Sequence, residues 1–338
     1  MKLSSIAGGV AALVLAVCAG GATFAQEKGM DNPRRGPYME QLKGKRVVFV
    51  PLAMGFDLTE AWAAVLKKQA AKLGYTFDIR DPNWNADAGA RAIQDVITEG
   101  TDVLVTHNPD IQSYGRLLQQ AEAAGIKVIQ LNMETTTQTD AYIGADWVEI
   151  GEAGGRALVD RCSPGKGISN KIAIIQGIPT GAADVYQMRG LWNVLDAHPE
   201  IEVVSQQAGS YDPSKARSIM ATIIQQHPDL CGSFGIWDSQ EAGAGSALQE
   251  AGKADQVFSV TSGGGNETAC ENLKKGLFDM LISYNAPLQG EVTAAKVAEL
   301  LESKDAAGTR KTTFFTPLTT ITADNANGFN CWSLNDLK

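Results

Sequence analysis

Several turns in the expected strand–helix pattern place an aromatic side chain beside a short polar one. The clearest cases are Phe56 in "MGFD", Tyr211 in "GSYDP" and Trp237 in "IWDS". The apolar faces of sugars stack on aromatic rings, whereas their hydroxyls both donate and accept hydrogen bonds, which suits aspartate, asparagine and glutamine. These turns therefore indicate a binding site for a sugar or a polyol.

Two aspartates in these turns have a second interpretation. Asp57 with Glu60, and Asp238 with Glu241, have the D-x-x-E spacing of a capping box at the start of a helix. Each aspartate either binds ligand or only caps its helix, and both interpretations stay open. Trp84, in "DPNWNAD", likewise belongs either to the rim of a cleft or to the surface.

Residues that would support catalysis, or would bind a metal or a cofactor, are sparse. Of the three histidines, His198 and His227 precede prolines in expected turns, and His107 alone lies at a strand end. No G-x-S-x-G nucleophile elbow occurs, and "TSGGGNE" lacks the Gly-Lys-Ser/Thr end of a phosphate-binding loop and the G-x-G-x-x-G spacing. We therefore expect a binding protein rather than an enzyme, with no cofactor and no metal.

The elements that must position these turns alternate along the chain. Apolar strands are expected at 46–52, 75–79, 102–106, 126–131 and 141–144, with amphipathic helices between the first four. The pattern restarts with a helix at 148–161 and continues with strands and helices to residue 284. Such alternation predicts an α/β protein with two doubly wound parallel sheets. Ligands bind outside the carboxyl ends of such strands, where these turns lie.

The first residues resemble an export signal. Lys2 precedes the apolar run "IAGGVAALVLAVC" and the small residues "GGATFA", so we expect a signal peptide at 1–25 that is cleaved after Ala25. A lipid anchor at Cys18 is the alternative, although Val17 fits that site poorly. The polar segment 26–45 is expected to be a loose leader. The mature protein should be soluble and periplasmic. The net charge of the full sequence is −9, and removal of Lys2 with the signal peptide makes it about −10, which argues against a nucleic-acid partner.

Four cysteines remain after the expected signal peptide: Cys162, Cys231, Cys270 and Cys331. An even number of cysteines in an oxidising compartment favours disulfides, for which three pairings are possible. No two of them have the C-x2-C spacing of a zinc site.

From Arg46 onward the chain resembles the periplasmic sugar-binding proteins of ABC importers, in particular the ribose-binding-protein-like group. The resemblance is carried by segments in the family's order, namely "LKKQAAKLGYTF", "GTDVLVTHNPD", "AAGIKVIQLNM", "GSYDPSKA" and "SFGIWDSQEAGAGSALQEAGK". It implies the type I periplasmic binding fold, with two lobes joined by three crossings of a hinge. The N-terminal lobe would comprise 46–146 plus 286–317, and the C-terminal lobe 147–285 plus 318–338.

The resemblance also implies a set of ligand contacts. The positions that match the family's binding residues are Phe56, Asp57, His107, Asn108, Asn132, Gln187, Tyr211, Trp237, Asp238, Ser262 and Asn285. Met133 and Gln187 stand where the family has arginines, so no bidentate clamp for an acidic ligand remains. We therefore expect a neutral monosaccharide or polyol rather than a uronate.

The resemblance further implies the disulfides Cys162–Cys231 and Cys270–Cys331. It implies a protein, expected to be a monomer, that delivers its ligand to the permease subunits of an ABC transporter. The alternative is a receptor for a sugar-like signal that acts through a chemoreceptor or a sensor kinase, with the same fold and site.

Overall fold

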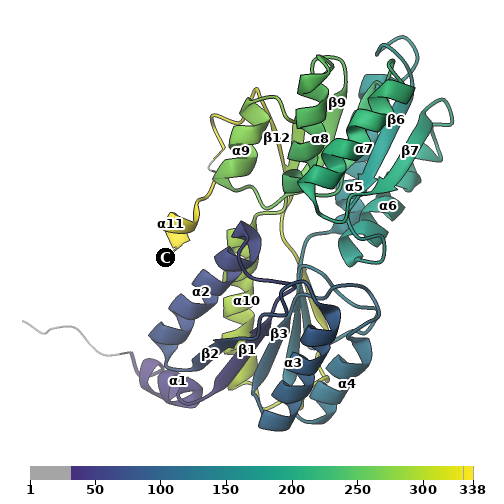
Figure 1. Ribbon diagram of the computed structural model, residues 1–338. Coiled ribbons are helices and arrows are strands. Elements are labelled where there is room, and N and C mark those ends of the chain that lie inside the picture. The colour runs from purple at the N-terminus through teal and green to yellow at the C-terminus, as the bar shows by residue number, and fades with distance from the viewer. Residues whose placement is uncertain (1–31, 330, 338) are drawn as a thin grey trace, which may run out of the picture.

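The computed structural model describes residues 32–329 and 331–337 and divides them between two α/β lobes, one above the other in Figure 1. Each lobe is built on a six-stranded sheet with helices on both faces. The two-lobe α/β fold expected from the sequence is therefore confirmed. The expected signal peptide, with Ala25 and Cys18, lies outside the described residues.

The N-terminal lobe is the lower one in Figure 1, and its strands are parallel in the order β11-β5-β4-β3-β1-β2. The strands are β1 (Arg46–Val50), β2 (Thr76–Ile79), β3 (Val103–Thr106), β4 (Lys127–Leu131), β5 (Ala141–Gly144) and β11 (Thr312–Phe315). The covering helices are α2 (Asp57–Leu73), α3 (Ala86–Glu99), α4 (Gly115–Ala123) and α10 (Ala286–Glu302). Every residue of β3 and β5 is buried, as expected for strands covered on both faces.

The C-terminal lobe repeats this plan in the order β12-β10-β9-β8-β6-β7, with β12 antiparallel to β10. Its strands are β6 (Lys171–Gln176), β7 (Glu202–Ala208), β8 (Gly232–Gly235), β9 (Phe258–Gly263), β10 (Met280–Ser283) and β12 (Thr319–Thr322). Its helices are α5 (Trp147–Cys162), α6 (Ala182–Leu195), α7 (Pro213–Gln226), α8 (Asp238–Glu250) and α9 (Glu267–Lys274).

Helix ends follow the turn chemistry of the sequence. Gly74 ends α2 with a φ of 83°, a left-handed conformation that glycine adopts without strain. Asn85 caps α3 and Asp212 caps α7, each by accepting a hydrogen bond from a backbone N–H in the first turn. Because Trp84 and Tyr211 directly precede these caps, both rings lie at helix starts, where the lobes face each other.

Three crossings join the lobes, after β5, after β10 and after β11. The hydroxyl of Thr316 in the third crossing lies 3.2 Å from the carbonyl oxygen of Gly144 in the first. The same hydroxyl lies 2.9 Å from the carbonyl oxygen of Tyr284 in the second. Asp146 and Asn285 cap the helices that follow the first two crossings. The crossings therefore lie side by side as a hydrogen-bonded hinge.

Part of the segment expected to be a loose leader is helical. Residues Arg35–Leu42 form α1, which contacts α10; Leu42 is fully buried, and Tyr38 and Met39 pack against the core. The expectation was wrong because so short a helix depends on tertiary packing rather than on a local sequence pattern. The strand β11 was missed for a similar reason, since pairing with β5 defines it.

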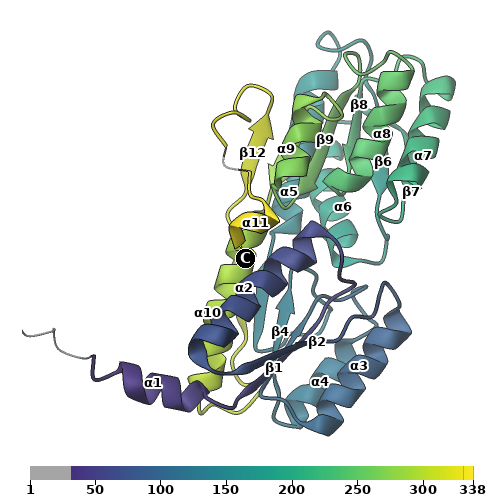
Figure 2. The ribbon, with the colours of Figure 1, turned by 60° about the vertical axis from the view of Figure 1, so that its left-hand side comes forward.

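Two disulfides lie in the C-terminal lobe and join the cysteines that the family resemblance pairs. Cys162 and Cys231 are 5.8 Å apart between Cα atoms, and Cys270 and Cys331 are 6.4 Å apart. The second disulfide holds the C-terminal tail, whose helix α11 (Leu334–Leu337) packs against α2 of the N-terminal lobe (Figure 2). None of the helices in the described ranges is long and apolar enough to cross a membrane.

Candidate ligand-binding site

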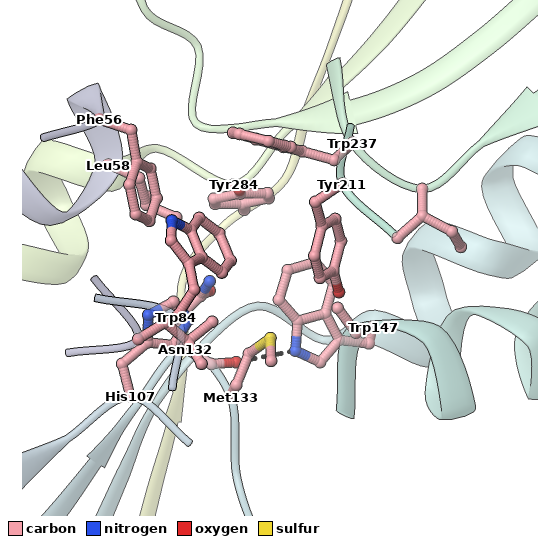
Figure 3. A pocket seen from close by; sticks show the side chains of 13 residues that line it. Phe56, Leu58, Trp84, His107, Asn132, Met133, Trp147, Tyr211, Trp237 and Tyr284 are labelled. Atoms are coloured by element: carbon pink, nitrogen blue, oxygen red, sulfur yellow. Dashed lines mark hydrogen bonds between the residues drawn. The ribbon is translucent and has the colours of Figure 1, made fainter. Parts of the chain in front are cut away.

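A cavity of about 40 Å³ lies between the lobes, where the carboxyl ends of the strands meet (Figure 3). Its walls carry six aromatic rings, those of Phe56, Trp84, Trp147, Tyr211, Trp237 and Tyr284. The other lining residues are Leu52, Leu58, His107, Asn132, Met133, Ala183 and Ile236. We call this space the aromatic cavity. Ligand pockets usually enclose about 300–1,000 Å³, so the lobes must part or rings must turn before a sugar enters.

Four of these rings, which we call the aromatic quartet, contact one another in a closed circuit. Phe56 stacks on Trp84 at 5.4 Å between centroids, and both belong to the N-terminal lobe. Tyr211 meets Trp237 at 5.9 Å, and both belong to the C-terminal lobe. The circuit closes across the lobes through Phe56–Trp237 at 6.0 Å and Trp84–Tyr211 at 6.5 Å. Aromatic pairs of this kind stabilise their contact by about 0.5–1.5 kcal/mol beyond burial, so the quartet favours contact between the lobes.

Three residues of the cavity wall have positive φ although they are not glycines. The φ angles are 65° at Trp84, 62° at Asn132 and 61° at Tyr211. Bulky residues rarely adopt this conformation, and it persists where surrounding contacts fix it, commonly at functional sites. The side chain of Gln240 accepts the Tyr211 N–H at 2.7 Å, and the Tyr211 hydroxyl donates to the buried Asp184 at 3.1 Å. The backbone therefore holds these side chains toward the cavity at some conformational cost.

His107 and Asn132 bring polar groups to the aromatic cavity. His107 is 2 % exposed, and neither ring nitrogen has a hydrogen-bond partner within the described part of the chain. Burial lowers the pKa of His107 to about 3, so the ring is neutral and offers one donor and one acceptor. The Asn132 side-chain oxygen accepts from Gln289 at 3.0 Å, while its Nδ2 has no partner among residues 32–329 and 331–337. Buried polar groups normally have partners, so these atoms point to a polar ligand.

A second space of about 200 Å³ adjoins the aromatic cavity and shares Phe56, Leu58 and Trp237 with it. We call it the acidic compartment, because its other lining residues are Asp57, Asp238, Ser239, Gly264, Asn266 and Trp332. The Asn266 side-chain amide donates to Asp57 across the lobes at 2.5 Å. Burial raises the pKa of Asp238 to about 7, and the charge of Asp57 acts in the same direction.

The structure separates the expected contact residues into three groups. Phe56, His107, Asn132, Tyr211 and Trp237 line the aromatic cavity, and Asp57 and Asp238 line the acidic compartment. Asn108, Gln187 and Ser262 are fully buried and line neither space, and Asn285 is exposed and caps α10.

Hydrogen bonds to the backbone account for the buried group. Asn108 donates to the Met133 carbonyl at 2.7 Å, and Ser262 donates to the Ile236 carbonyl at 2.7 Å. Gln187 is 3.5 Å from the same Ile236 carbonyl. The side-chain oxygens of Asn108 and Gln187 nonetheless have no hydrogen-bond partner in the described ranges.

The capping interpretation of the two aspartates fails. The residue in the cap position is Phe56 for α2 and Trp237 for α8, and neither helix has a side-chain cap bond. Glu60 accepts the Gly55 N–H at 3.1 Å, but Gly55 precedes the cap position, so this bond is not the second half of a capping box either. The Asp57 carboxylate instead accepts from Asn266, whereas Oδ1 of Asp238 accepts the adjacent Ser239 N–H in the first turn of α8 and its Oδ2 remains free of such a bond.

Some residues of the site were not found from the sequence. Trp147 lies at the start of α5, where its ring N–H donates to the Asn132 carbonyl at 2.9 Å, and the apolar lining residues Leu52, Leu58 and Ala183 were also missed. The place of Trp147 directly after a hinge crossing is the signal that would have marked it. Trp84, which the sequence left open, lines the cavity although it is 48 % exposed.

Comparisons with known proteins agree with this architecture. The family model described as periplasmic binding protein domain matches residues 47–305. Ribose import binding protein RbsB of Bacillus subtilis (strain 168) is 24% identical over 240 residues, which cover 71% of this chain and 76% of that protein. RbsB of Escherichia coli (strain K12) is 30% identical over 190 residues, 56% of this chain and 62% of that protein, which is less than two thirds of its length.

A solved structure extends the likeness over more of the chain. An ABC transporter solute binding protein of Mycobacterium smegmatis with bound glycerol has a TM-score of 0.75 and 25% sequence identity to this chain. The match covers 86% of this chain and 98% of that one. Because the family model spans well over half of the sequence, the chain belongs to the periplasmic binding protein domain family.

Proposed function

We propose that this protein is an extracytoplasmic solute-binding protein that captures a neutral sugar or polyol between its lobes and delivers it to an ABC permease. The observation that carries the proposal is the aromatic cavity, whose rings surround buried polar atoms without partners. Relatives named as ribose import binding proteins, and a solved homologue with bound glycerol, support a ligand of this class.

The lining chemistry supports an uncharged or hydroxyl-rich ligand over an acidic one. No lysine or arginine lines either space among the described residues, so a carboxylate on the ligand would be buried without a cation. The aromatic quartet would cover the apolar faces of a sugar, and His107 and Asn132 would bond its hydroxyls. A ligand bound between the lobes would add contacts to both of them and so stabilise the closed arrangement.

The remaining expected contacts keep roles in the proposal. Asn108 and Gln187 each hold an unpartnered side-chain oxygen that would bond a hydroxyl once the lobes adjust to a ligand. Ser262 would position the Ile236 backbone beside the ligand, and Asn285 would position the hinge helix α10.

The proposal also covers the location of the protein in the cell and the boundaries of its two lobes. Residues 1–25 would direct export to the periplasm and be removed near Ala25 rather than lipidated at Cys18. The lobes would comprise 46–146 plus 286–317 and 147–285 plus 318–338, moving about the three crossings. The protein would act as a monomer that presents its closed form to the permease subunits, without turning over its ligand.

A thermal-shift screen of the mature protein against sugars, polyols and sugar acids tests this function. A ligand at 100 times its dissociation constant adds about 2.7 kcal/mol to stability, a readily measured increase in melting temperature. The proposal expects hits among sugars or polyols. Hits confined to uronates and other sugar acids would contradict it.

A further inference from the structure

The two adjoining spaces between the lobes are lined by acid and by aromatic rings, without a basic side chain. Among the described residues that line them, the only formally charged side chains are Asp57 and Asp238. His107 is held neutral by its burial. Two carboxyl groups from opposite lobes thus border one compartment with no positive charge between them, and burial together with the charge of Asp57 disfavours the ionised form of Asp238 there.

Asp238 has acceptor capacity that the protein leaves unused. The residue is 4 % exposed, and its Oδ1 accepts from the Ser239 N–H at 2.7 Å. Its Oδ2 has no hydrogen-bond partner in the ranges that the structure describes. The second carboxylate, that of Asp57, accepts a bond from Asn266. Because Asp238 lines a space of about 200 Å³, this free oxygen can accept a hydrogen bond from a ligand in that space.

The other walls of the acidic compartment suit a cation. The rings of Phe56, Trp237 and Trp332 line it, and aromatic faces attract ammonium groups. Trp332 is fixed in place, because its ring N–H donates to the Gly264 carbonyl at 2.8 Å and the disulfide of Cys331 precedes it. A metal ion fits poorly, since the described residues contain no group of three or more histidine, cysteine, aspartate or glutamate side chains that would hold one.

We propose that the acidic compartment binds a protonated amino group, so that the ligand is an amino-substituted sugar or polyol with its polyol part in the aromatic cavity. The inference rests on the proposed capture of a sugar or polyol between the lobes, and it changes the ligand class from neutral compounds to those that carry a protonated amine. The ammonium group would donate to the free oxygen of Asp238 and to Asp57, and it would offset the repulsion between the two carboxylates as the lobes close.

Calorimetric titration of the mature protein with matched ligands tests the inference. The matched sets are glucose, glucosamine and N-acetylglucosamine, the corresponding galactose set, and sorbitol with 1-amino-1-deoxysorbitol. The expected result is that, in each set that binds, the amine binds about tenfold or more tightly than its uncharged counterparts. Equal affinities for amine and uncharged ligands would overturn the inference and leave the proposed function standing. Failure of every compound, together with no hit in the wider screen, would overturn both.

Two variants test whether the preference for an amine depends on the acidic compartment. Asp238→Asn keeps the size of the side chain and removes its charge, so the ratio of amine to uncharged affinity should fall toward one. Asp160→Asn, at a side chain that is 81% exposed, removes a surface charge and should keep the ratio of the unsubstituted protein. A ratio that is unchanged in Asp238→Asn would contradict the assignment of the amine to the acidic compartment. Melting curves of both variants would show that they fold.

Discussion

Replacing Trp237 by alanine tests the role of the aromatic quartet most sharply. The change removes two ring contacts, one to Phe56 across the lobes at 6.0 Å and one to Tyr211 at 5.9 Å. Only the pair with Phe56 joins the two lobes, so this ring contact should stabilise closure by about 0.5–1.5 kcal/mol beyond burial. The ligand needs the closed arrangement, so the loss of this contact alone should lower affinity by roughly 2- to 13-fold, and the loss of stacking on the ligand adds to that.

Isothermal titration calorimetry with the tightest ligand from the screen measures this loss. Trp237→Phe keeps an aromatic face and should bind with intermediate affinity. Trp192→Ala is the matched control, because that tryptophan is 36 % exposed on α6 and lines neither space. Affinity of Trp237→Ala within twofold of the unsubstituted protein, with a normal melting curve, would refute the role assigned to the quartet.

Two further predictions concern stability. Burial raises the pKa of Glu241 from 4.5 to about 8, so the folded state holds a proton that the unfolded state has lost, and stability should fall as pH rises across this interval. In urea unfolding at several pH values, Glu241→Gln should show a shallower decline than the unsubstituted protein; an equal slope would contradict this account. Replacing Cys162 and Cys231 together by serine should lower the free energy of unfolding by roughly 2–4 kcal/mol, because the bridge closes a loop with a sequence separation of 69. An unchanged midpoint in urea under non-reducing conditions would argue against that disulfide.

Several residues that line the aromatic cavity were predictable, because the turn pattern that marks them is local. Phe56, Tyr211 and Trp237 each follow a strand and precede a helix, and parallel strands bring such turns to one edge of a sheet. The spacing of apolar residues predicted most strands and helices for the same reason, since it too is a local property of the sequence. Local spacing was not sufficient for the two expected capping boxes. Asp57 and Asp238 have the D-x-x-E spacing of such a box, but both line the acidic compartment between the lobes.

The sequence did not predict which of these side chains reach the cavity and which lie beneath its surface, because that depends on contacts between segments distant in the sequence. Asn108 follows β3 and Ser262 lies near the end of β9, yet each donates to a backbone carbonyl from a neighbouring turn and lies below the cavity surface. Asp184 drew no attention in the sequence, although it accepts from the Tyr211 hydroxyl and burial raises its pKa to about 7. Trp147 was missed because its position depends on the hinge that precedes α5.

A crystal structure of the mature protein with a ligand from the screen tests the central claim most directly. The account predicts one sugar or polyol between the lobes, with rings of the aromatic quartet against its apolar faces and with His107 and Asn132 within hydrogen-bond distance of its hydroxyls. Density for the ligand outside the cleft, or in the cleft without contact to rings from both lobes, would contradict it.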